Sequence, residues 1–136
     1  MEKQIKLYKN YQPHITNIED EKQKTEEMIQ NIYSLCINES NQNNRDYALS
    51  SLPEEYKYVS NKYSIVPGSY LRYIDTTNYK NMKLKLGGFV IHDNGHSLVY
   101  KNDNRFVKLN KKHCVFYTTT WCVSFTKLLS VCMYIY

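Results

Sequence analysis

The feature that most constrains the fold is a change of hydrophobic period near Tyr63. Beyond this residue, apolar and polar side chains alternate, which is the pattern of half-buried β-strands. The connections between alternating segments are short and polar. Neighbouring strands must therefore be antiparallel, because a parallel crossover needs a dozen or more residues. The expected strands cover residues 69–75, 83–92, 97–101, 105–109 and 114–125.

Two local signals shape this sheet. Asn94-Gly95 is the dipeptide most typical of a two-residue type I′ hairpin. Gly87-Gly88 lies in the longest expected strand, where a bend or bulge favours residues without a side chain. We therefore predict an α+β protein in which five or six antiparallel strands follow one another as a meander and curl into a small barrel.

The residues before the sheet have a helical period. Between residues 15 and 37, apolar side chains recur every three or four positions, with Glu, Asp and Lys between them. The apolar face of this amphipathic helix includes Ile15, Ile18, Ile29 and Ile32. The face either docks on the chain's own sheet, which is the favoured interpretation, or binds a partner, including a second copy of the chain. A heptad-like rhythm is present but is short and polar in its middle.

Composition divides the chain into three parts. Residues 38–44 are polar throughout and typical of a linker. Pro53 is suited to the first turn of a short helix. The expected organisation is a helical segment with its linker over residues 1–44, a short helical connector over 45–62 and a barrel-like domain over 63–136.

Side chains suited to catalysis or metal binding form no familiar set. The His and Cys residues of the sheet match no zinc spacing; they are His92, His96, His113, Cys114 and Cys122. His113 and Cys114 are adjacent, and neighbours on a strand point to opposite faces, so they cannot form a nucleophile–base pair there. The cysteines form no CxxC pair and are expected to be free thiols. We expect no catalytic residue, no metal, no cofactor and no enzymatic activity.

Charge is distributed unevenly along the chain. Residues 1–60 hold seven Lys or Arg and ten Asp or Glu, net −3, whereas residues 61–136 hold eleven and three, net +8. A curved sheet with interleaved cations and tyrosines can stack bases and neutralise phosphates. The residues that would bind DNA or RNA are Tyr70, Arg72, Tyr79, Lys80, Lys83 and Lys85. The alternative is that the lysines only keep a Tyr-rich surface soluble.

No segment is long enough to cross a membrane as a helix. The longest uncharged apolar run covers residues 128–136, against about 20 residues for a span. This tail is either a last strand or the product of a shifted reading frame. The first residues lack the apolar core of a secretory signal. We expect a protein that is not secreted and has no membrane span.

Four short motifs, each in or beside an expected strand, lie within residues 64–125. Gly68 begins Gly-Ser-Tyr-Leu-Arg-Tyr-Ile, Gly87 begins Gly-Gly-Phe, Val107 begins Val-Lys-Leu-Asn and Trp121 begins Trp-Cys-Val. This set resembles uncharacterised small β-domain proteins of large eukaryotic double-stranded DNA viruses. The motifs describe mainly a fold, and the resemblance implies no established reaction.

The resemblance implies a virion-associated or assembly protein. Its partners would be viral structural or assembly proteins, and it would be located in the virion or in the host cytoplasm, at the viral factory. We therefore expect a non-enzymatic interaction module built on the small barrel, with nucleic-acid binding on the basic, Tyr-rich surface as the alternative function.

Overall fold

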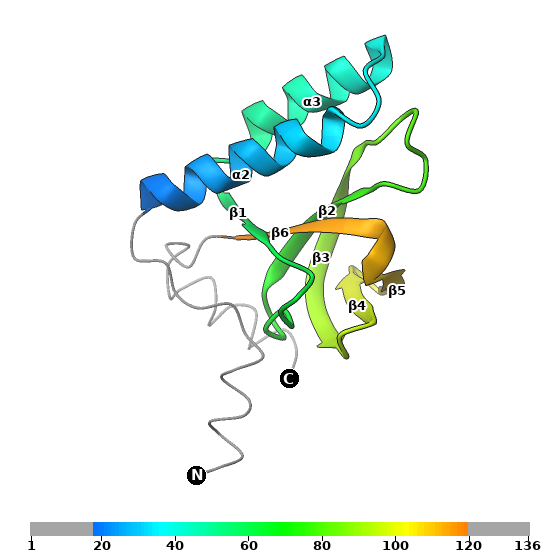
Figure 1. Ribbon diagram of the computed structural model, residues 1–136. Helices are drawn as coiled ribbons and strands as arrows, with labels where there is room; N and C mark the ends of the chain where they lie inside the picture. Colours follow the sequence, from blue (N-terminus) through cyan, green and yellow to red (C-terminus); the bar gives the residue numbers. More distant parts are fainter. Residues whose placement is uncertain (1–17, 120–136) are drawn as a thin grey trace.

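The computed structural model describes residues 18–119, in which two helices precede a six-stranded sheet (Figure 1). An irregular segment separates the first strand from the other five. In chain order the elements are α2 (Ile18–Tyr33), α3 (Glu39–Ser51), β1 (Tyr56–Val59), β2 (Tyr70–Asp75), β3 (Leu84–Asp93), β4 (Ser97–Asn102), β5 (Arg105–Asn110), the short 3₁₀ helix η1 (Lys111–His113) and β6 (Cys114–Thr119).

The strands pair antiparallel in the order β1-β6-β2-β3-β4-β5. The expected α+β class and antiparallel pairing are confirmed. The expected meander holds only from β2 to β5, because β6 returns to lie between β1 and β2. The described sheet is not closed into a barrel, since β6 pairs with β2 and β1 instead of joining β5 to the far edge.

The prediction of a linker over residues 38–44 is wrong, because these residues form the cap and the first turns of helix α3. Asn38 caps the helix: its side-chain oxygen accepts a hydrogen bond from the Asn41 backbone N–H at 2.7 Å. Asn41 is buried, and its side-chain amide donates to the carbonyl oxygens of Cys36 and Tyr79. Polar residues that resemble a linker in sequence thus act as a helix cap and as a buried anchor.

The helical connector expected over residues 45–62 is also corrected. Helix α3 ends at Ser51, and Tyr56–Val59 form strand β1, in which Tyr58 lies opposite Tyr117 of β6. A strand of four residues offers only two alternations of side chains, so its period is too short to stand out in the sequence.

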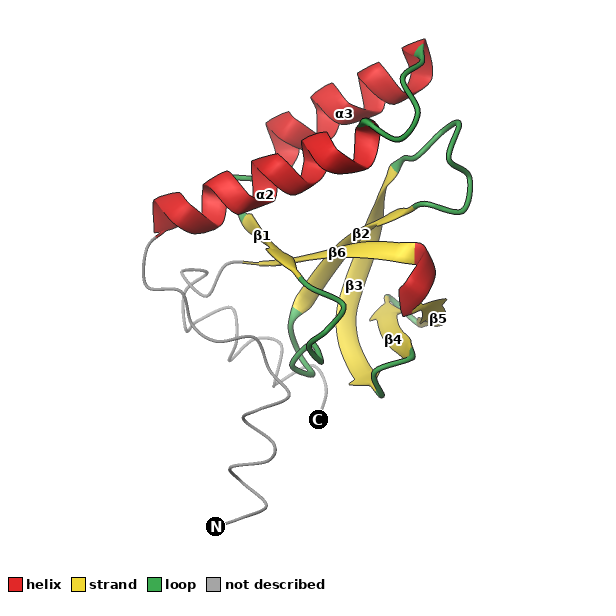
Figure 2. Ribbon diagram, viewed as in Figure 1, coloured by secondary structure: helices red, strands yellow, loops and turns green. Residues whose placement is uncertain are grey.

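Each face of the sheet has its own core, and both helices lie on the same side of the sheet (Figure 2). We call the face enclosed by the curling strands the inner face; its buried side chains include Leu71, Tyr73, Val90, Tyr100 and Phe116. The opposite, outer face is covered by both helices at its β1 end. The buried residues there are Ile29, Ile32, Tyr33, Ala48, Leu52, Ile74, Met82 and Tyr117.

The Gly87-Gly88 pair permits three strands to approach closely. A Cβ atom on Gly87 would lie 2.0 Å from the Leu71 carbonyl oxygen on β2, and one on Gly88 would lie 2.1 Å from the Lys101 carbonyl oxygen on β4. The β2–β3 register shifts at this point, between Leu71 and Arg72. The bend expected from the sequence is therefore a bulge that tolerates no side chain.

The turn between β3 and β4 is not the expected type I′ hairpin. That turn needs a positive φ at both central residues. Gly95 has φ 91°, but among the described non-glycine residues only Asp103 has a positive φ. The Asn94 side chain instead accepts hydrogen bonds from the backbone N–H groups of His96 and Ser97 at 2.9 and 2.8 Å. The side chain thus organises the turn.

A buried ion pair joins three segments at the end of the inner face. Lys111 Nζ lies 2.7 Å from Asp93 Oδ2, and the two side chains are only 3% and 1% exposed. The same carboxylate oxygen accepts from the Ile65 backbone N–H, and Lys111 Nζ donates to the Tyr63 carbonyl. The pair therefore positions the irregular segment before β2 and the short helix that leads into β6.

Candidate nucleic-acid interface

One line of residues crosses four strands on the outer face, beyond the part that the helices cover. Tyr70 of β2 lies opposite Phe89 of β3, Phe89 lies opposite Lys101 of β4, and Lys101 lies opposite Phe106 of β5. We call these four residues the cross-strand row. Their chain neighbours Leu71, Val90, Tyr100 and Val107 pack in the inner core. Side chains alternate along a strand, so the row itself points outward.

The row combines rings with a cation. The Tyr70 and Phe89 rings meet edge to face, with centroids 5.0 Å apart and planes at 84°. Lys101 Nζ lies 5.7 Å from the centroid of Phe106. Phe106 is 65% exposed, and Tyr70 and Phe89 are half-buried. The row is therefore an accessible surface of three rings with an ammonium group among them.

Further cations and apolar groups flank the row. Lys108 is exposed on β5 opposite Val99, one outward position along from Phe106. Leu86 is 69% exposed on the same face of β3. Residues 63–119 hold nine Lys or Arg and three Asp, net +6, so this part of the chain attracts anions.

Arg72 lies on the same face, two residues from Tyr70. Its side chain is under α3 and only 9% exposed. Its guanidinium carbon lies 6.0 Å from the Tyr47 ring centroid and 5.9 Å from that of Tyr56. Hydrogen bonding with Arg72, assisted by Ser51, lowers the pKa of the Tyr47 hydroxyl. Burial raises the pKa of Tyr56.

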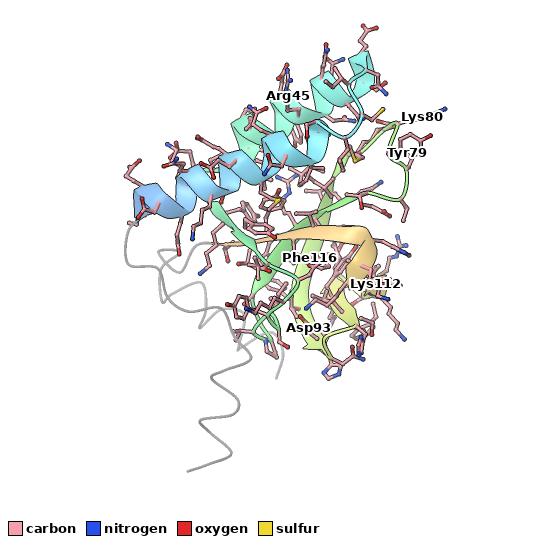
Figure 3. All side chains as sticks on the ribbon, in the orientation of Figure 1. Arg45, Tyr79, Lys80, Asp93, Lys112 and Phe116 are labelled. Atoms are coloured by element: carbon pink, nitrogen blue, oxygen red, sulfur yellow. The ribbon has the colours of Figure 1, made fainter. Side chains whose placement is uncertain are left out.

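Two of the six residues expected to bind nucleic acid lie far from the row. Tyr79 and Lys80 are exposed in the β2–β3 loop, near the α2–α3 connection and at the opposite end of the molecule from Asp93 (Figure 3). The α3 N-terminus positions this loop: Asn41 donates to the Tyr79 carbonyl at 2.8 Å, and Asn38 donates to the Lys80 carbonyl at 2.9 Å.

The remaining lysines of the expected set are exposed but point elsewhere. Lys83 precedes β3, and Lys85 lies opposite Tyr73, whose ring is in the inner core. Lys85 therefore belongs to the opposite face from Tyr70 and Arg72. The structure brings Tyr70 and Arg72 together and does not bring the lysines to them.

The partner-binding interpretation of the N-terminal helix needs correction at two positions. Ile29 and Ile32 are 0% and 4% exposed in the outer-face core, so neither is available to a partner. They are buried because α2 packs against β1 and α3. Ile18 is 54% exposed at the start of α2, and Ile15 lies outside the described residues.

The His and Cys residues of the sheet do not gather. Among residues 18–119 no group of three or more His, Cys, Asp or Glu is placed to hold a metal ion. His113 lies in η1, just before the strand that begins at Cys114, and Cys122 lies outside the described range. Burial raises the pKa of the Cys114 thiol to about 12, so this cysteine is a poor nucleophile. No helix of the described part is long and apolar enough to cross a membrane.

Three residues of the row were missed in the sequence, namely Phe89, Lys101 and Phe106. Each lies in an expected strand, but their alignment depends on the β3–β4 and β4–β5 registers and on the bulge at the glycine pair. The short turn between Asn102 and Arg105 was the usable signal, because a two-residue turn sets Lys101 opposite Phe106.

Comparison of the chain with protein-family models, with curated protein sequences and with solved structures finds no match. Function is therefore inferred from the chemistry of the outer face.

Proposed function

We propose that the protein is a non-enzymatic binder of single-stranded nucleic acid and that the cross-strand row is its binding platform. The observation that carries this proposal is the register that aligns Tyr70, Phe89, Lys101 and Phe106 on a part of the sheet that the two described helices do not cover. Exposed rings on a sheet stack with unpaired bases, and cations between them neutralise phosphates.

The chemistry favours single strands over duplexes. Every base has a face that can stack on a ring, at about 1–3 kcal/mol per base, but bases in a duplex already stack on one another. Phe89 and Phe106 lie two strands apart, about 10 Å, with Lys101 between them. Such a surface is suited to stacking with individual, unpaired bases of a flexible nucleic-acid strand. It does not require a particular nucleotide sequence.

The test is fluorescence anisotropy of labelled single- and double-stranded DNA and RNA with the full chain over a range of salt. We expect the protein to bind single strands. The logarithm of the association constant should fall linearly with the logarithm of the salt concentration. Phe106→Ala should weaken binding about tenfold, the loss of one stacked base. Tyr79→Ala is the matched control, because Tyr79 is also an exposed ring, at 55%, but lies away from the row. Equal effects of the two substitutions, or no binding at low salt, would contradict the proposal.

A second candidate is an assembly module, the function that the viral resemblance implies. Its supporting observation is charge complementarity between the two layers. Residues 18–51 hold seven Asp or Glu and three Lys or Arg, net −4, against net +6 for residues 63–119. The favoured occupant of the basic sheet is then the acidic helical layer of a second copy, in a head-to-tail contact. Sedimentation at low and high salt separates the candidates: a chain that is monomeric at low salt excludes self-assembly of this kind.

A further inference from the structure

Arg72 is a buried cation without an anion. Its side chain is nine-tenths buried on β2. Among residues 18–119 four ion pairs are formed, by Lys22, Arg45, Lys57 and Lys111, and none includes Arg72. The Nε–H group is buried and has no hydrogen-bond partner among the described residues. A guanidinium is always charged, and burying it without a counter-ion is costly.

The surroundings of Arg72 compensate this cost only in part. The ring faces of Tyr47 and Tyr56 attract the cation, but a ring offers no acceptor to the Nε–H donor. Lys111 of η1, the other buried cation of residues 18–119, contrasts with it: Lys111 Nζ has a carboxylate oxygen at 2.7 Å and a backbone carbonyl oxygen at 3.0 Å. A native structure that leaves a charged donor unsatisfied favours a role for that donor in binding.

We propose that Arg72 is a phosphate-binding site, filled by a backbone phosphate of the strand that lies on the cross-strand row; the identity of this ligand rests on the proposed function. Two residues along a strand span about 7 Å, so a base stacked at Tyr70 brings a neighbouring phosphate within reach of Arg72. The Nε–H and a terminal N–H of one guanidinium bind two phosphate oxygens side by side.

Tyr47 controls access to this site. Its side chain extends from α3 and is 54% exposed, and its ring centroid lies 6.0 Å from the Arg72 guanidinium carbon. The nearby Arg72 guanidinium, chiefly through hydrogen bonding, lowers the pKa of the Tyr47 hydroxyl. An incoming phosphate competes with that hydroxyl. Tyr47→Phe removes the competitor and keeps the ring, so it should tighten phosphate binding a few-fold.

The test uses the arginine Nε–H signals in ¹H–¹⁵N NMR spectra of the full chain. The sequence has three arginines, Arg45, Arg72 and Arg105, so the spectrum has three such signals. The signal of Arg72 is assigned by its loss in Arg72→Lys. If that variant does not fold, Arg45→Lys and Arg105→Lys assign it by elimination. Arg45 is the internal control, because it pairs with Asp46 on the surface of α3 at 3.2 Å.

Inorganic phosphate and then a single-stranded oligonucleotide are titrated at constant ionic strength. We expect the Arg72 signal to shift and saturate with both, and the Arg45 signal to stay in place. An unmoved Arg72 signal at saturating oligonucleotide overturns the phosphate site and leaves the stacking platform standing. A phosphate-dependent shift without any oligonucleotide binding supports the site and overturns the proposed function.

Binding measured against salt gives an independent readout. Arg72→Gln should reduce the slope of log affinity against log salt by about one, the loss of one phosphate contact, whereas Arg45→Gln should leave it unchanged. If Arg72→Gln folds and its slope equals that of the wild type, the inference is overturned.

Discussion

The two faces of the sheet carry similar aromatic residues in opposite environments. On the inner face Tyr73, Tyr100 and Phe116 pack together, with the Tyr73 and Tyr100 hydroxyls hydrogen-bonded at 3.1 Å. On the outer face Phe106 is 65% exposed beside Lys101. Rings on the inner face are buried against one another, while the rings of the row remain partly or largely exposed. Residue type alone therefore does not separate core from surface in this protein.

The largest expected effect is on the inner face. Phe116→Ala removes a fully buried ring from the core and should lower the free energy of unfolding by about 3–5 kcal/mol. Urea unfolding followed by circular dichroism measures this change. A loss below about 1 kcal/mol would mean that the inner face is not the main core of the sheet.

Breaking the buried ion pair should cost nearly as much. Asp93→Asn leaves the Lys111 ammonium buried without its carboxylate and should destabilise the protein by about 3 kcal/mol. Lys22→Met is the control, because the Lys22–Glu54 pair is accessible to solvent and surface ion pairs contribute little to stability. Equal costs in the same unfolding measurement would contradict the structural role given to the Asp93–Lys111 pair.

Alkaline pH should weaken both cores. Burial raises the pKa of Cys114 on the inner face to about 12 and that of Tyr33 in the outer-face core to about 12. A raised pKa means that the folded state holds the neutral form. The associated stability is complete below pH 9 for Cys114 and below pH 10 for Tyr33, and it is lost as the pH rises towards 12.

The loss is on the order of 4 kcal/mol for Cys114 and 3 kcal/mol for Tyr33, because one pKa unit corresponds to about 1.4 kcal/mol. Unfolding midpoints measured from pH 8 to 12 test it. In a plot of the unfolding midpoint against pH, Tyr33→Phe should flatten the part above pH 10. The substitution also removes the hydrogen bond that Tyr33 donates to the Met82 carbonyl. A flat profile across this range in the wild type would show that neither group is buried as described.

The smallest effect on stability is expected at the row. Phe106→Ala should change the free energy of unfolding by less than about 0.5 kcal/mol, because the ring is largely exposed already. Its expected effect on nucleic-acid binding is the tenfold loss described above. A large loss of stability would place Phe106 with the core and would remove the difference between the two faces.

Local patterns predicted most of the strands but not their neighbours. The alternation that begins near Tyr63 predicted β2 to β5 to within one residue at each end. The same local reading took residues 38–44 for a linker, because a buried Asn and an Asn cap look polar until the loop that they bind is in place. It also grouped Lys85 with Arg72, although the two lie on opposite faces of the sheet.

The sequence by itself determined the α+β class, the antiparallel pairing, an irregularity of the strand at Gly87-Gly88 and the basic charge of the sheet. These features depend on side-chain period, on turn length and on composition, which are local. Only the tertiary structure decided that β6 inserts between β1 and β2, that α3 covers Arg72, and that Tyr70, Phe89, Lys101 and Phe106 form one row. Such arrangements depend on contacts between residues far apart in the chain, whose free energy no local pattern records.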